Sequence, residues 1–167
     1  MHRIVAAVLA WALFVSQAWA YYPGPQAASA TATLATATGN ATTAYKLMGL
    51  AGAITPKVAG RLRVVLSGDA FSATLADGGT VVIYYGTGTA PSNGATGVSP
   101  CGTTSCATAG SAVKFVAATT AERAPFGLSA IVTGLTVGTA YWIDIGLLSS
   151  TTVTATVENI SMTAQEF

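Results

Sequence analysis

Along most of the chain after residue 45, hydrophobic positions alternate with polar or small ones. Because successive side chains of a β-strand point to opposite faces of a sheet, this period-two pattern predicts strands that bury one face. Gly, Pro, Asn and Asp interrupt the pattern at intervals, as is typical of turns between short strands. The expected strands cover residues 45–50, 61–68, 80–86, 112–119, 126–135, 140–148 and 152–167. No stretch has a helical period of useful length, so we expect an all-β chain, an antiparallel β-sandwich or a small barrel.

Two runs indicate which side chains face the core. In "RLRVVLSG", Leu62, Val64 and Leu66 share one face, which leaves Arg61, Arg63 and Val65 on the other. Arg61 and Arg63 are therefore candidates for contact with another subunit or a ligand. In the last run, Val153, Ala155 and Val157 share one face and Ile160 and Met162 have the opposite phase. This change of phase predicts a β-bulge or bend near Asn159.

The run "AYWIDIGLL" contains the most notable aromatic residue. Tyr141, Ile143, Ile145 and Leu147 share a face that is apolar enough to be core, and Trp142 and Asp144 share the other. A tryptophan on the face away from its own core is either a subunit contact or a platform for a ligand. Since no other binding residues join it, the pattern favours Trp142 and Asp144 as subunit contacts.

Turns and loops are expected at three places. "DGG" at 77–79 is a turn signal, because glycine tolerates positive φ, and "TGLTVGT" at 133–139 resembles a tight turn. Residues 86–111 are expected to form a long irregular loop with an exposed tip. Tyr84 and Tyr85, just before this loop, are candidate exposed aromatic residues.

The first twenty residues differ from the rest. A basic start, "MHR", precedes the apolar stretch "IVAAVLAWALFV", and "SQAWA" ends with small residues at the positions of a cleavage site. This layout predicts a signal peptide that is cleaved before Tyr21. A membrane anchor is the alternative, but the apolar run is slightly short for a span. Residues 21–44 are expected to be an Ala/Thr-rich extended arm, and residues 45–167 the β-sandwich domain.

Charge and cysteine content narrow the functional classes. Only 8% of the residues are charged, with seven Lys and Arg against six Asp and Glu, and no basic cluster supports nucleic-acid binding. A nearly neutral surface tends to associate, so we expect an oligomer. Cys101 and Cys106 in an exported chain predict a disulfide that closes a short loop. A zinc site would need further ligands, and no histidine remains after cleavage.

Catalytic motifs are not expected. Without a histidine in the mature chain, the common nucleophile–histidine–acid arrangement is impossible. Two carboxylates could hydrolyse a glycoside, with Asp69 and Asp77, or Asp144 and Glu158, as the candidate pairs. Turn aspartates commonly have local roles instead. We therefore expect a protein that is not an enzyme, with no cofactor and no metal.

Three separated motifs resemble a module of tailed-bacteriophage and prophage structural proteins. They are "LSGDAFSATLADGGTVVIYYGTGTAPSNGA", "APFGLSAIVTGLTVGTAYWIDIGL" and "ENISMTAQEF", which occur in that order over about residues 45–167. The resemblance implies a tail-associated, head-fibre or capsid-decorating component, commonly trimeric, and tilts the fold towards a jelly roll over an immunoglobulin-like sandwich. It brings no catalytic residues. In such an assembly, Ile4–Phe14 could instead be retained as a docking peptide.

The sequence thus predicts a structural protein that acts by self-assembly, as a homotrimer or another homo-oligomer, and by docking. The N-terminal arm would tether it to a capsid or tail protein, outside the cytoplasm or on a virion surface. The alternative is a secreted carbohydrate-binding or adhesive domain, with a glycan stacked on Tyr84, Tyr85 or Trp142.

Overall fold

The structure is a computed structural model that describes residues 28–34, 38–95, 106–120 and 122–167. The predicted signal peptide, residues 21–27 and 35–37 of the predicted arm, and Cys101 lie outside these residues. The elements are β1 (Ser29–Leu34), β2 (Thr38–Asn40), β3 (Lys46–Leu47), β4 (Gly52–Ile54), β5 (Arg61–Ser72), β6 (Gly78–Thr87), β7 (Cys106–Val116), β8 (Ala124–Thr133), β9 (Tyr141–Ser149) and β10 (Ala155–Glu166). The described residues include no helix long and apolar enough to cross a membrane.

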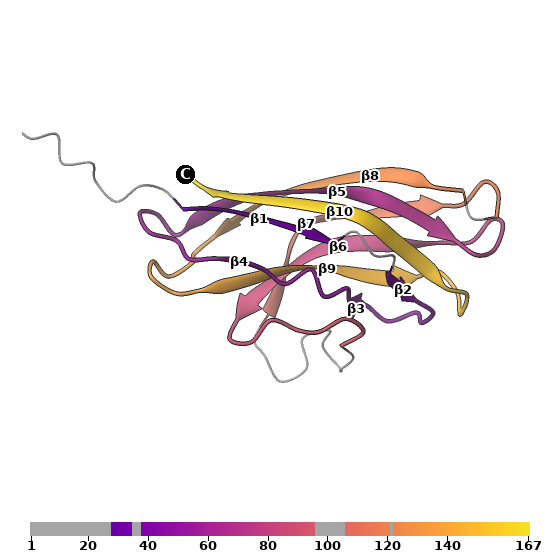
Figure 1. The fold of residues 1–167 in the computed structure, drawn as a ribbon, viewed down its shortest axis with the longest axis horizontal. Coiled ribbons are helices and arrows are strands. Elements are labelled where there is room, and N and C mark those ends of the chain that lie inside the picture. The colour runs from indigo at the N-terminus through magenta and orange to yellow at the C-terminus, as the bar shows by residue number, and fades with distance from the viewer. Residues whose placement is uncertain (1–27, 35–37, 96–105, 121) are drawn as a thin grey trace, which may run out of the picture.

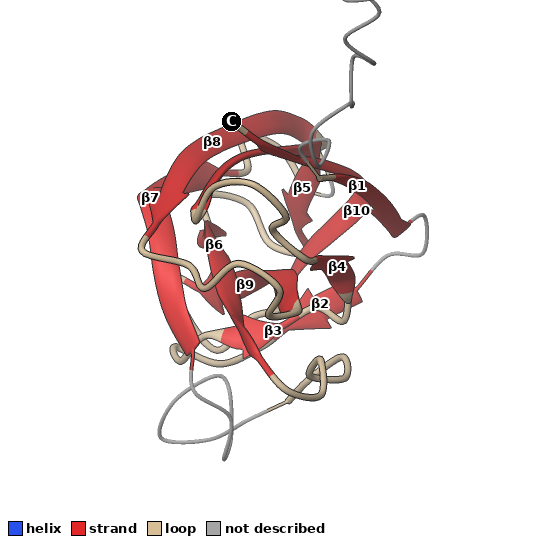
Figure 2. Ribbon diagram, turned by 90° about the vertical axis from the view of Figure 1, so that its left-hand side faces the viewer, coloured by secondary structure: helices blue, strands red, loops and turns tan. Residues whose placement is uncertain are grey.

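These strands form two antiparallel sheets that pack against each other. Sheet A has the order β1-β10-β5-β8, with β2 also paired to β10, and sheet B has the order β3-β9-β6-β7, with β4 also paired to β9. Figure 1 shows the two layers from the side, and Figure 2 shows both sheets curving around a shared interior. The predicted all-β, antiparallel sandwich is confirmed.

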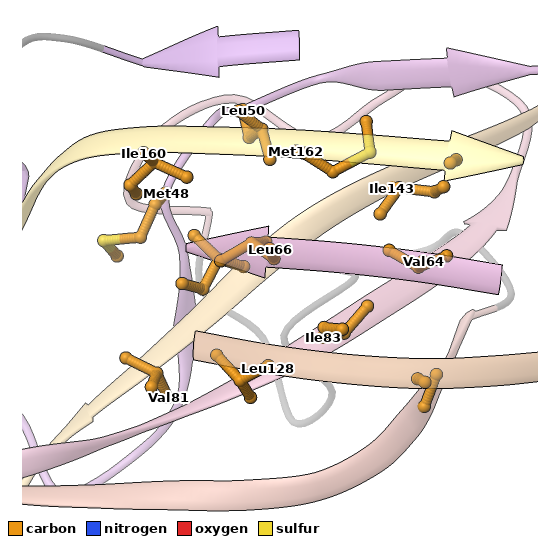
Figure 3. Packing of buried hydrophobic residues seen from close by; sticks show 14 of the residues in the cluster. Met48, Leu50, Val64, Leu66, Val81, Ile83, Leu128, Ile143, Ile160 and Met162 are labelled. Carbon is orange, nitrogen blue, oxygen red and sulfur yellow. The ribbon is translucent and has the colours of Figure 1, made fainter. Parts of the chain in front are cut away.

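The core lies between the sheets and is built from their inward-facing residues. Leu62, Val64 and Leu66 of β5 are at most 1% exposed, as the alternation predicted. They pack with residues of sheet B such as Ile83 and Ile143 in one apolar cluster (Figure 3). Dense packing of this kind, rather than local propensity, specifies the arrangement of the two sheets.

The predicted irregularity in the last strand is present. The pairing of β10 with β5 shifts between Glu158 and Ser161, and Asn159 has a φ of 52°. Asparagine tolerates this left-handed conformation better than most residues. The bulge allows both Val157 and Ile160 to face the core, although they are an odd number of residues apart.

Part of the predicted N-terminal arm belongs to the β-sandwich. Residues 29–34 and 38–40 belong to sheet A, where β1 and β2 pair with β10. Ala30 and Ala32 pack against the core. The alternation of Ala and Thr in this segment has little hydrophobic contrast, so the sequence pattern did not indicate these two strands. Their pairing with β10 holds them in the sheet.

Two expected loop boundaries also differ from the structure. Strand β7 begins at Cys106, so residues 106–111 are strand and not loop. Gly78 and Gly79 lie in β6 and not in the turn, and a Cβ on Gly78 would overlap the carbonyl oxygen of Phe115. These glycines are therefore required for close strand packing, whereas the left-handed turn residue is Ala76, with a φ of 60°.

Replacing Ala76 with glycine is expected to stabilise the protein by about 1 kcal/mol. A non-glycine residue at positive φ has a conformational strain of roughly 1–2 kcal/mol, part of which is offset because glycine makes the unfolded chain more flexible. Ala76 is exposed, so no packing is lost. Urea denaturation of the wild type and Ala76→Gly measures the difference. A less stable variant would contradict the left-handed turn.

Candidate functional site

The chain itself covers β9 and β6 on the outer face of sheet B, whereas the edge strand β7 is mostly exposed. Leu47, Val82, Tyr84 and Trp142 form a second apolar cluster on that face, with Tyr45 and Ala90 packed against it. The segment after β6 lies against this cluster, where Gly94 N donates a backbone hydrogen bond to Leu47 O (2.9 Å), and Met48 N donates one to Ile145 O (3.0 Å) at the edge of the sheet beside β9. This face therefore has a small core of its own.

Trp142 belongs to this second core and is not an exposed contact. Its side chain does face away from the main core, as the alternation predicted, but it is only 2% exposed. The ring nitrogen Nε1 donates a hydrogen bond to the carbonyl oxygen of Thr87 (3.1 Å). The expectation of an exposed subunit contact was wrong, because alternation identifies a face of a sheet but not what lies on top of it.

Asp144 is fully buried on the same face. Its carboxylate accepts hydrogen bonds from the backbone amides of Gly49 (3.0 Å), Leu50 (2.9 Å) and Ile145 (2.7 Å). Desolvation raises the pKa of Asp144 to about 6, although these backbone hydrogen bonds act in the opposite direction. Asp144 thus fixes the segment between β3 and β4 to β9 and is not accessible to a partner.

The two candidate tip aromatics have different surroundings. Tyr84 is 7% exposed and packs edge-on against Tyr45, with 5.9 Å between the ring centroids, so it is not an exposed tip residue. Tyr85 is half-buried and lines a shallow hollow of about 250 Å³ together with Tyr141 and Cys106. The disulfide between Cys101 and Cys106 stays a prediction, because Cys101 lies outside the described part of the chain.

Glu166 is a structural residue that sequence reasoning missed. Its buried carboxylate accepts hydrogen bonds from the backbone amides of Ala28 (2.8 Å), Lys57 (2.9 Å), Val58 (2.7 Å) and Ala59. Burial alone raises the pKa of Glu166, but the four amides outweigh it and lower the pKa to about 2. The signal was its phase, since Met162, Ala164 and Glu166 all point inward along β10.

The carboxylate pairs considered for hydrolysis have other partners. Asp77 is buried and accepts hydrogen bonds from Gly78 N (2.8 Å) and Thr151 Oγ1 (2.6 Å). Asp144 is in sheet B, whereas Glu158 is in sheet A and pairs with Arg123. Asp69 accepts a hydrogen bond from Asn159 Nδ2 (3.0 Å). The structure therefore does not bring Asp144 and Glu158 together as a catalytic pair.

The surface is less neutral than the composition suggests. Four of the six carboxylates in the sequence are buried: Asp77, Asp144, Glu158 and Glu166. Every lysine and arginine of the described residues is exposed or half-buried. The net charge of the chain stays near zero, but most of the exposed charged side chains of the described residues are basic.

The outer face of sheet A remains uncovered by the described chain and is the candidate functional site. Arg61, Arg63 and Val65 of β5 are exposed on it, as predicted, beside Ile131 of β8, which is 62% exposed. Arg63, Ile131, Gln165 and Phe167 line a hollow of about 430 Å³. The Arg61 guanidinium lies over the Phe167 ring, 4.8 Å from its centroid. Large exposed apolar side chains beside arginines are typical of contact surfaces.

Between its two ends this face carries small, uncharged side chains. They are Val65 and Ser67 of β5, Gly127 and Ser129 of β8, and Ser161 and Thr163 of β10, all exposed. The far end carries Asp69, Glu158 and Arg123, the last lying over the Phe71 ring at 5.4 Å. The face is thus basic at one end, carries small side chains in the middle, and contains two carboxylates at the other end.

Comparison with known proteins adds no identification. Among the described residues there is no group of three or more His, Cys, Asp or Glu side chains that could hold a metal ion. No protein-family model matches the chain, and no curated protein matches it. The structure establishes the antiparallel β-sandwich, and the resemblance to phage structural proteins stays a prediction.

Proposed function

We propose that this protein is a non-enzymatic structural component that acts by assembling with other protein chains through the outer face of sheet A. One observation carries the proposal. The chain covers β6 and β9 of sheet B with its own segments, whereas the outer face of sheet A is left with Arg63, Ile131 and Phe167 exposed. A sheet face of this kind is suited to packing against another sheet.

We also propose a jelly-roll topology. The strand orders β1-β10-β5-β8 and β3-β9-β6-β7 support it. Counting β1 with β2 and β3 with β4, the first, last, third and sixth of eight strands lie side by side in one sheet, and the second, seventh, fourth and fifth in the other. This is the arrangement of two interleaved Greek keys.

The biological setting we propose is a virion-type surface, decorating or tail-associated component. Its support is the order of the three motifs within residues 45–167. The N-terminal segment would tether the sandwich to a capsid or tail protein, or would be removed on export before Tyr21. Mass spectrometry of the native protein's first residue distinguishes these routes, and we expect Tyr21, whereas Met1 would contradict export.

The second candidate function is carbohydrate binding, which the hollow at Tyr85 and Tyr141 favours. Aromatic side chains beside a polar rim can stack on a sugar ring. Trp142 and Tyr84 are too buried to contribute. Glycan-array binding that is lost in Tyr85→Ala but retained in Ile131→Ser would favour this candidate over assembly through sheet A.

Sedimentation velocity of the wild-type protein tests the main proposal. We expect a concentration-dependent assembly at micromolar concentrations, because the exposed apolar side chains of sheet A gain burial on association. A species that remains monomeric up to about 100 µM, which corresponds to an association energy weaker than about −5.5 kcal/mol, would contradict self-assembly.

A further inference from the structure

We propose that the outer face of sheet A pairs with the same face of a second copy in an antiparallel, two-fold arrangement. The inference rests on the proposed assembly function and names its partner and geometry. It follows from the distribution of charge along the face. Arg61 and Arg63 lie at one end of β5, and Asp69 lies towards the other.

Charge excludes the alternative two-fold arrangement. If the symmetry axis ran along the strands, Arg63 would face Arg63 of the second copy. If instead the axis crosses the strands at the level of Leu66, Arg63 faces Asp69 of the second copy, and the reverse pair forms at the other end. A symmetric dimer uses the same patch on both chains, so of the two arrangements only the second places Arg63 opposite a carboxylate.

The exposed side chains of the neighbouring strands β8 and β10 are compatible with the same two-fold axis. Leu66 is level with Leu128 of β8 and Met162 of β10 in the sheet register. About these positions, Ser129 would face Gly127 of the second copy, and Thr163 would face Ser161. Ile131, the most exposed large apolar side chain, would face Pro125 of the second copy. The small middle residues allow the faces to approach to the ~10 Å that separates packed sheets.

The size of the face fits a stable dimer. Four strands about 4.8 Å apart and about ten residues long offer roughly 600 Å² of projected area. This is close to the ~800 Å² that each partner contributes to a standard interface. The Arg61 and Arg123 guanidinium groups stack on Phe167 and Phe71, one pair at each end of the face, so the ends are partly ordered before association.

Charge reversal in the full-length protein tests the pairing. We expect Arg63→Glu and Asp69→Arg each to raise the dimer dissociation constant about tenfold or more, measured by sedimentation velocity. The double variant restores the opposite charges and is expected to return to within about threefold of the wild type. Lys114→Glu, on exposed β7 of sheet B, is the matched control and is expected to leave the dimer unchanged.

Ser129→Arg is a second test that leaves Arg63, Asp69 and the hydrogen bond from Asn159 Nδ2 to Asp69 unchanged. Ser129 is exposed in the middle of the face, so the longer side chain is expected to block close approach without disturbing the monomer fold. A monomeric Ser129→Arg with wild-type melting temperature supports the inference. Wild-type-like association of Arg63→Glu and Ser129→Arg would overturn it while leaving assembly through another surface. A trimeric wild type would overturn the two-fold arrangement, and a monomeric wild type would overturn the proposed function itself.

Discussion

Replacing Trp142 with alanine is expected to lower the free energy of unfolding by about 3–5 kcal/mol, the usual cost of removing a buried tryptophan. Trp142 is 2% exposed and packs in one apolar cluster with Leu47, Val82 and Tyr84. Its removal leaves a cavity and also deprives the Thr87 carbonyl of a hydrogen bond. Urea denaturation of the wild type and the variant measures the effect.

Ile131→Ala is the matched control for this prediction. Ile131 is 62% exposed, so truncation is expected to change monomer stability by no more than about 0.5 kcal/mol. The two variants should also differ in association, which only Ile131→Ala is expected to weaken directly. A Trp142→Ala protein that unfolds like the wild type but no longer associates would show that Trp142 is a subunit contact after all.

The stability of the protein is expected to be greatest between about pH 4 and pH 5, because two buried carboxylates have oppositely shifted pKa values. The pKa of Asp144 is raised to about 6, so the folded state holds its proton more tightly than the unfolded state does. The stability that this provides is complete below about pH 4 and is lost as the pH rises to about 6. The expected loss is about 3 kcal/mol, since each pKa unit corresponds to about 1.4 kcal/mol.

Glu166 has the opposite effect. Its pKa is lowered to about 2, so its contribution is complete above about pH 4.5 and is lost as the pH falls towards 2. Urea denaturation from pH 2 to pH 8 should therefore give a profile with a maximum. Asp144→Asn should remove the decline from pH 4 to 6, and Glu166→Gln should remove the decline below pH 4.5. A decline above pH 4 that persists in Asp144→Asn would contradict the assignment.

The strands and their inward faces could largely be predicted from the sequence, because they depend on a local pattern. The alternation in β5 identifies Leu62, Val64 and Leu66 as core, and the change of phase near Asn159 identifies the bulge. Both features follow from geometry within a single strand.

The covering of sheet B could not be predicted in this way. Whether Trp142 and Asp144 are exposed depends on segments about 50 to 100 residues away in the sequence, which hydrogen bond to Asp144 and pack on the tryptophan. Likewise, the inward phase of Glu166 can be seen in the sequence, but the backbone amides of Lys57 and Val58 that donate hydrogen bonds to its carboxylate cannot. Such contacts are non-local, and a periodic pattern contains no information about them.

Hydroxyl-radical footprinting of the full-length protein, below and above its association concentration, tests most directly which sheet face is covered and which is free. In the dilute protein we expect oxidation of Ile131 and Phe167 and protection of Trp142, and in the concentrated protein protection of all three. Oxidation of Trp142 in the dilute protein, with protection only on association, would contradict the covered face of sheet B and the contact face of sheet A together.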